Sequence, residues 1–160
     1  MTFDNSKTII STRIRLFAAT VIFLIFITLT YAAKLIKYPV LGMSDTVWTL
    51  ILTACYLIIA FLPMYLSYQY VWFSDDNDKI IFRYFHAGIV SGRKNSVEIN
   101  KQSFSGYKVD KKLFGLIQSI LLFQHIKGGE AKYPPIYISA LTREEKAKVF
   151  RSLNMSLRKV

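Results

Sequence analysis

Two long apolar stretches divide the chain into an N-terminal and a C-terminal part. No charged residue occurs in the 18 positions between Arg15 and Lys34, or in the 29 positions between Asp45 and Asp75. A helix that rises about 1.5 Å per residue needs roughly 20 apolar residues to cross a hydrocarbon core about 30 Å thick. We therefore expect a transmembrane helical hairpin over residues 16–67. It follows a cytoplasmic tail at residues 1–15, and its helices lie at about 16–33 and 47–67.

Aromatic and basic residues near the ends of these stretches indicate how the hairpin lies in a membrane. Trp48 stands at one end of the second stretch, as aromatic side chains do at a membrane interface. The aromatic residues at the other end are Tyr65, Tyr68, Tyr70 and Trp72. Six Lys and Arg residues flank the helices on the side of the chain termini, against two in the connecting loop. The positive-inside rule then predicts that both termini face the cytoplasm.

A cleaved signal peptide is the alternative interpretation of the first stretch. Thr30, Tyr31 and Ala32 imitate a cleavage site with small residues. The apolar run is longer than the roughly 7–15 residues usual for a signal peptide, which favours an uncleaved anchor.

The residues after the second stretch alternate between apolar and polar, which is typical of short antiparallel strands. Residues 70–73 and 79–85 predict a hairpin, with the Asp/Asn-rich segment 74–78 as its turn. Pro134 and Pro135 predict that the last strand begins at a sheet edge. Four further strands are expected at about 96–100, 103–109, 119–126 and 133–139, with a glycine turn at 127–131, and a seventh strand would lie around Ile89–Val90.

The period changes to that of a helix near the C-terminus. Thr142 and Glu145 form a capping box, and Val149, Phe150, Leu153 and Leu157 follow on one helical face. The expected fold class is therefore an α+β membrane protein. Two N-terminal transmembrane helices precede a small antiparallel sheet or open barrel at residues 68–160, which the C-terminal helix closes.

The composition indicates that lysine and arginine are the main candidates for functional contacts. The chain has 21 Lys and Arg residues against 10 Asp and Glu, a net charge of +11. Its single cysteine, Cys55, excludes an intramolecular disulfide and a zinc site built from cysteines. His86 and His125 have no second ligand at metal-binding spacing, and no phosphate loop or nucleophile motif is present. We therefore expect no catalytic residue, no metal, no cofactor and no nucleic-acid partner.

The C-terminal segments resemble the bacterial pleckstrin-homology-like (PH-like) domains. The likeness covers about Tyr70 to Leu157: a basic and apolar strand KIIFRYF, a strand ending near Ile99, a Phe-Gly-Leu loop at Phe114–Leu116, and a Thr-capped final helix. Many such proteins carry paired transmembrane helices just before the domain. The resemblance implies a bacterial inner-membrane protein whose seven-stranded sheet and C-terminal helix serve binding or assembly. Eukaryotic relatives bind phosphoinositides through basic residues of their first strands, where this chain has Lys79 and Arg83 without the Lys-x-Arg spacing of those relatives.

Two basic clusters are the other candidates for contact with a lipid or a protein partner. A basic pair beside exposed apolar residues can dock on an anionic membrane at about 1 kcal/mol per nearby cation. The competing interpretation is that these residues are solvated loop charges. The first cluster is Arg93, Lys94 and Lys101, and the second is Lys108, Lys111 and Lys112, followed by Phe114.

The sequence therefore predicts a non-catalytic membrane protein whose PH-like domain binds a partner. The partner would be the anionic bilayer surface, a subunit of a membrane complex, or a second copy of the chain. An alternative from another class is an antiphage effector, in which a two-helix membrane segment carries a small β-barrel that binds a cyclic nucleotide and then disrupts the membrane.

Overall fold

The computed structural model describes residues 1–87 and 92–157, and the chain divides into two compact units. The helical unit is Ile10–Pro63, and the β unit joins Met1–Ile9 to Met64–Val160. The strand expected around Ile89–Val90 lies outside the described residues.

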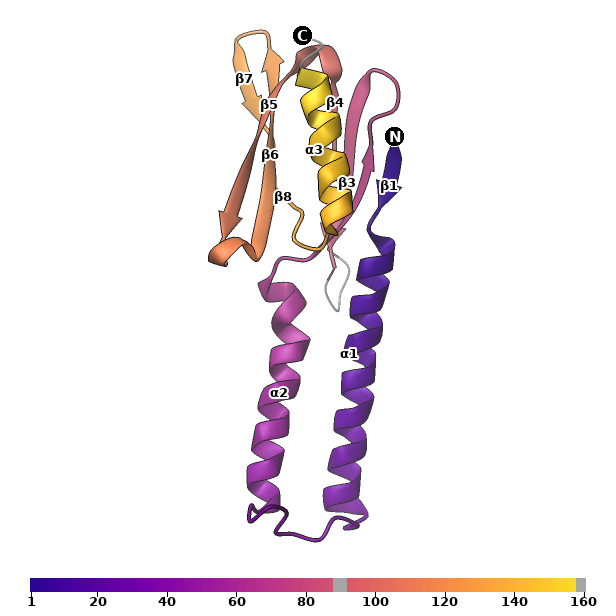
Figure 1. Cartoon of the computed structure of the whole chain (residues 1–160), viewed down its shortest axis with the longest axis vertical. Coiled ribbons are helices and arrows are strands. Elements are labelled where there is room, and N and C mark those ends of the chain that lie inside the picture. Colours follow the sequence, from indigo (N-terminus) through magenta and orange to yellow (C-terminus); the bar gives the residue numbers. More distant parts are fainter. Residues whose placement is uncertain (88–91, 158–160) are drawn as a thin grey trace. The chain divides into compact units, whose positions relative to one another are not determined.

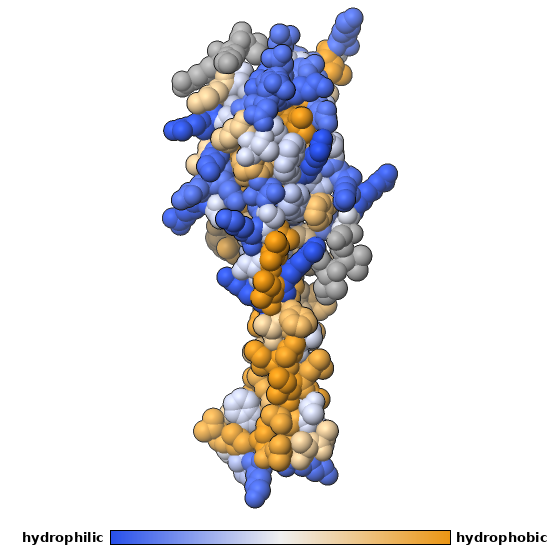
Figure 2. Space-filling model, turned by 90° about the vertical axis from the view of Figure 1, so that its right-hand side faces the viewer, coloured by the Kyte–Doolittle hydropathy of each residue, from blue (hydrophilic) through white to orange (hydrophobic). Residues whose placement is uncertain are grey.

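The helical unit contains two helices that are long and apolar enough to cross a membrane, as the sequence predicted. Helix α1 (Ser6–Ile27) continues into a π-helical turn at Thr28–Ala32, and α2 (Asp45–Tyr65) contains Pro63 in its last turn. Only 6% of the most apolar window of each helix is buried, so their side chains remain at the surface (Figure 2). Helix α1 begins ten residues before the predicted span. The prediction did not include these first turns because their residues are polar and basic and lie outside the apolar run.

The first sheet of the β unit contains the predicted hairpin. Strands β2 (Gln69–Ser74) and β3 (Lys79–His86) pair antiparallel across the turn at residues 75–78, and β4 (Asn95–Asn100) pairs with β3. Strand β1 (Thr2–Asp4) adds to the other side of β2, which makes the order β1-β2-β3-β4. Residues 1–15 were expected to form a tail, so strand β1 is a correction to the sequence-based expectation.

The second sheet is built around one long strand. A 3₁₀ turn at Lys101–Ser103 leads into β5 (Phe104–Lys112), and a second 3₁₀ turn at Leu113–Gly115 leads into β6 (Ile117–Ile126). Strand β6 pairs with β5 on one side and with β7 (Gly129–Lys132) and β8 (Ile136–Tyr137) on the other.

Two details of this sheet correct the sequence-based expectation. Residues 127–131 were expected to form only a turn, but Gly129–Lys132 pair with β6 as β7. The last strand is only two residues long, since neither Pro134 nor Pro135 can donate a backbone hydrogen bond.

The prediction of a single bent sheet or open barrel is corrected to two antiparallel four-stranded sheets. Within residues 1–87 and 92–157, no strand pairing joins β4 to β5, so the strands do not close into a barrel. The turn at Lys101–Ser103 separates these two strands and lets the second sheet fold over the first.

Helix α3 (Arg143–Leu157) closes the core that both sheets share (Figure 1). The predicted capping box is confirmed: the Thr142 N–H donates to Glu145 Oε2 at 2.7 Å, and the Glu145 N–H donates to Thr142 Oγ1 at 3.2 Å. Val149 and Leu153 are fully buried, and Phe150 stacks on Tyr107 with ring centroids 5.9 Å apart. The fully buried side chains around them are Val71, Phe73, Ile80, Phe82, Ile99, Ile120, Leu122, Ile136 and Ile138.

Candidate membrane-facing surface

Both apolar helices join the same end of the β unit. Asn5, at the start of α1, is fully buried; its side-chain amide donates to the Gln69 carbonyl at 2.9 Å, and its side-chain oxygen accepts the Val71 N–H at 2.9 Å. Gln69 begins β2 only four residues after Tyr65, the last residue of α2. We call the end of the β unit that carries Asn5 and Gln69 the helix-proximal end, and the end that carries the turn at residues 75–78 the far end.

The connection between β5 and β6 lies at the helix-proximal end. The Tyr137 N–H donates to Gln69 Oε1 at 2.9 Å, and Tyr137 pairs with Ser119 of β6. Strand β6 begins two residues earlier, at Ile117, so its turn at Leu113–Gly115 extends past this contact. Figure 1 shows β5 and β6 meeting at the end of the β unit where α3 begins.

Apolar side chains are exposed at this turn. Leu113 and Phe114 adopt left-handed backbone angles, with φ values of 49° and 55°, and Gly115 follows at 89°. A left-handed backbone is uncommon for residues other than glycine. Phe114 is fully exposed, while Leu113 and Leu116 are 41% and 62% exposed. We call Leu113–Leu116 the apolar tip; its strained backbone holds a phenyl ring in solvent, where it gains none of the roughly 2 kcal/mol that burial would give.

Basic side chains lie at the same end of the β unit as the apolar tip. Lys111 and Lys112 precede it on β5, and both are exposed. Arg93 and Lys94 belong to the same end, because Asn95 pairs with Tyr84 of β3, two residues before the His86 that pairs with Gln69. Helix α3 also begins there, since Ser139 Oγ accepts the Gln118 N–H at 3.0 Å, and this adds Arg143 and Lys146. Among the described residues, the acidic residues of this end are Asp4, Asp110, Glu144 and Glu145.

Lys146 differs from the other basic residues of this end in being half-buried and close to a second cation. Burial, and secondarily the nearby positive charge of Lys111, lower its pKa below the usual value. Lys146 could not be recognised from the sequence, because its neighbour Lys111 is 35 positions away and only the packing of α3 on β5 brings them together.

The other predicted contact residues do not join this surface. Lys79 lies 3.9 Å from Glu98, and Lys101 lies 2.5 Å from Asp75; both pairs are at or near the far end. The guanidinium of Arg83 stacks over its cross-strand neighbour Trp72, 4.9 Å from the ring centroid. Lys108 is exposed near the middle of β5.

The sequence cluster of Arg93, Lys94 and Lys101 is therefore divided. Strand β4 places Arg93 and Lys94 at the helix-proximal end and Lys101 at the far end, a separation of roughly 20 Å at about 3.3 Å per residue. The second cluster stays together only in part: Lys111 and Lys112 adjoin the apolar tip, and Lys112 also lies 4.0 Å from Asp110.

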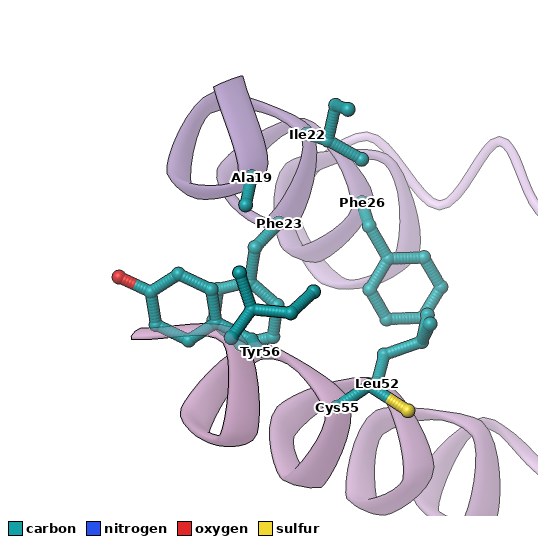
Figure 3. A pocket seen from close by; sticks show the side chains of 8 residues that line it. Ala19, Ile22, Phe23, Phe26, Leu52, Cys55 and Tyr56 are labelled. Carbon is teal, nitrogen blue, oxygen red and sulfur yellow. The ribbon is translucent and has the colours of Figure 1, made fainter. Parts of the chain in front are cut away.

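The helical unit contains an apolar groove of about 200 Å³ between α1 and α2 (Figure 3). Phe23 and Tyr56 stack across it with centroids 4.8 Å apart, and the Tyr56 hydroxyl hydrogen-bonds Thr20 at 3.1 Å. Its remaining lining residues are Ala19, Ile22, Phe26, Leu52, Cys55 and Ile59. The groove thus offers packing surface and one hydroxyl that already has a partner.

Across residues 1–87 and 92–157, no group of three or more His, Cys, Asp and Glu side chains is placed to hold a metal ion. Comparisons of the chain with protein-family models, curated proteins and solved structures found no match.

Proposed function

We propose that this chain is a non-catalytic integral inner-membrane protein whose PH-like β unit docks its helix-proximal end on the anionic cytoplasmic surface of the bilayer. One observation carries the proposal: the apolar tip and four basic residues lie at the end of the β unit to which both apolar helices connect. Those four residues are Arg93, Lys94, Lys111 and Lys112.

Strand β1 supports the proposed topology independently of charge counting. Thr2 pairs with Ser74 and Asp4 with Trp72, so the two segments that flank the helical unit share one sheet. Backbone pairing of this kind needs both segments on the same side of a membrane. If α1 and α2 both cross the bilayer, the N-terminus and the β unit therefore face the same compartment. The excess of Lys and Arg on that side supports the cytoplasm as this compartment.

Chain length also supports contact between the apolar tip and the bilayer. Four residue steps connect Tyr65 with Gln69, a reach of at most about 14 Å. The apolar tip lies at the same end of the β unit as Gln69, beyond the contact of Tyr137 with Gln69 by two residues of β6 and the turn itself. This short connection keeps the β unit close to the bilayer, and in the proposed orientation Leu113, Phe114 and Leu116 insert among the head groups while Lys111 and Lys112 meet anionic lipids.

The packed interior of the β unit supports a role for its outer surface. Val149 and Leu153 of α3 fill the space between the sheets against Phe82, Ile120 and Leu122, where a ligand-binding barrel would hold its ligand. This arrangement favours surface docking over the alternative of a cyclic-nucleotide-binding effector.

A fluorescence experiment on the full chain in nanodiscs tests the proposal. An environment-sensitive fluorophore is attached at Leu116→Cys in a Cys55→Ser background, which leaves Phe114 in place. Emission should shift to the blue in discs with 30% phosphatidylglycerol and remain water-like in pure phosphatidylcholine. The shift should weaken when Lys111 and Lys112 are both changed to Ala, and also as salt rises. Equal emission in the two kinds of disc would exclude docking on anionic lipid and leave a protein partner as the working hypothesis.

A further inference from the structure

The packing of α3 on β5 brings two lysines together beside the apolar tip. On the face of β5 that α3 covers, the Tyr107 hydroxyl donates to Asn154 Oδ1 at 2.9 Å, and the Tyr107 ring stacks on Phe150. Lys111 lies four residues after Tyr107 on β5, and Lys146 lies one helical turn before Phe150 on α3. The strand and the helix run in opposite directions, so the contact that joins the two rings brings Lys111 near enough to Lys146 for its charge to lower the Lys146 pKa.

Within the part of the chain that the structure describes, neither lysine of this pair has a carboxylate oxygen within 4.0 Å of its ammonium group. The salt bridges found there involve the N-terminus, Lys79, Lys101 and Lys112. Glu145, one residue before Lys146, is bonded to the Thr142 N–H as the capping residue. Lys146 is half-buried, and burial together with the charge of Lys111 lowers its pKa. The repulsion between two neighbouring cations, one of them partly desolvated, is best offset by a bound anion that carries two negative charges.

We propose that Lys111 and Lys146 bind the phosphate of a lipid head group that is a phosphomonoester, as in phosphatidic acid. This inference rests on the proposed function, because it names the lipid class that the docked surface prefers. A phosphomonoester carries about −1.5 to −2 charges at neutral pH and has three acceptor oxygens, whereas a phosphodiester carries one charge. It can therefore accept a charge-assisted hydrogen bond from each lysine at once. The apolar tip beside the pair enters the interface in which such a phosphate lies.

The fluorophore at Leu116→Cys also tests this inference, in nanodiscs of phosphatidylcholine with increasing fractions of one anionic lipid. The mole fraction that gives half of the blue shift should be about fivefold lower for phosphatidic acid than for phosphatidylglycerol, the equivalent of about one more cation contact. Lys111→Gln and Lys146→Gln should each bring the two half-points together. The matched controls Lys108→Gln, three positions away on the opposite face of β5, and Lys148→Gln, on an exposed position of α3, should keep the preference.

The possible results separate this inference from the proposed function. Equal half-points for the two lipids, or an equal loss of preference in the control variants, would overturn the phosphomonoester site while docking stands. No blue shift with either anionic lipid would overturn docking itself. Glycerol 3-phosphate in solution tests for a soluble ligand: it should not remove the preference at millimolar concentration, and if it does, the assignment to a lipid is wrong. Circular dichroism of each glutamine variant should match the parent protein, which excludes unfolding as the cause.

Discussion

The Lys101 ammonium lies 2.5 Å from Asp75 Oδ1, with both side chains largely buried at 23% and 17% exposure. Lys101 also donates to the backbone carbonyls of Asp75 and Asn77, at 3.1 and 2.7 Å. Ser152 of α3 donates to the second carboxylate oxygen of Asp75. Asp75 therefore joins the β2–β3 turn to the turn before β5 and to α3, and Lys101 has a structural role in holding the two sheets together.

Replacing this lysine should destabilise the β unit. Lys101→Met leaves the Asp75 carboxylate partly buried without its cation, and we expect the free energy of unfolding to fall by about 2 kcal/mol. Urea unfolding in detergent, followed by the fluorescence of Trp72 in a Trp48→Phe background, measures the change. Lys94→Met, at an exposed position, should stay within about 0.5 kcal/mol of the parent protein. If both variants lose the same stability, the ion pair has no special role.

The buried Asn5 should be needed to keep strand β1 on the sheet. Asn5→Ala removes the acceptor of the Val71 N–H and the donor to the Gln69 carbonyl, at a cost of about 3 kcal/mol for two buried groups without partners. Hydrogen exchange of the Val71 amide should accelerate strongly, whereas the Ile120 amide in the other sheet should change much less. An unchanged rate at Val71 would show that β1 does not depend on this side chain.

Helix α3 should stabilise the β unit through its buried face. Leu153 is fully buried while Met155, two positions later, is 55% exposed. Leu153→Ala should cost about 3 kcal/mol of unfolding free energy through lost contacts and a cavity. Met155→Ala should cost less than about 0.5 kcal/mol. Thermal unfolding of the two variants, followed by circular dichroism, compares them directly, and similar midpoints would mean that α3 does not cover the core.

Reporter fusions test the topology that strand β1 and the basic residues support. A reporter active only in the cytoplasm should work after residue 160 and fail when inserted at Gly42, in the loop between α1 and α2. Cytoplasmic activity at Gly42 would contradict two membrane spans.

Local signals predicted the parts of the fold that local forces stabilise. The two apolar helices follow from uninterrupted hydrophobicity, the β2–β3 hairpin from alternation around an Asp/Asn turn, and the start of α3 from the capping box at Thr142 and Glu145. Strand β1 could not be predicted, because three residues carry no recognisable alternation and their partner strand is about 70 positions away. The division into two sheets depends on a three-residue turn at Lys101–Ser103 whose sequence resembles a loop.

The candidate surface was predictable where neighbours in sequence form it. Lys111, Lys112 and Phe114 are consecutive or nearly so, and the structure keeps them together beside the apolar tip. The pairing of Lys101 with Asp75 spans 26 positions, and the approach of Lys146 to Lys111 spans 35. Sequence spacing cannot distinguish a cation that is already paired from one that is free to bind, since tertiary packing decides which carboxylates come near.

The depth of the apolar tip in an anionic bilayer tests the docking proposal most directly. The full chain is labelled either at Leu116→Cys or, as a far-end control, at Asn77→Cys, each in a Cys55→Ser background, and is reconstituted into nanodiscs with 30% phosphatidylglycerol. Lipids with a spin label at a shallow acyl position should quench the probe at position 116 strongly and the probe at position 77 hardly at all, and the difference should shrink in pure phosphatidylcholine. Weak quenching at both positions, or equal quenching of the probe at position 116 in anionic and neutral discs, would contradict docking of the β unit on the anionic membrane.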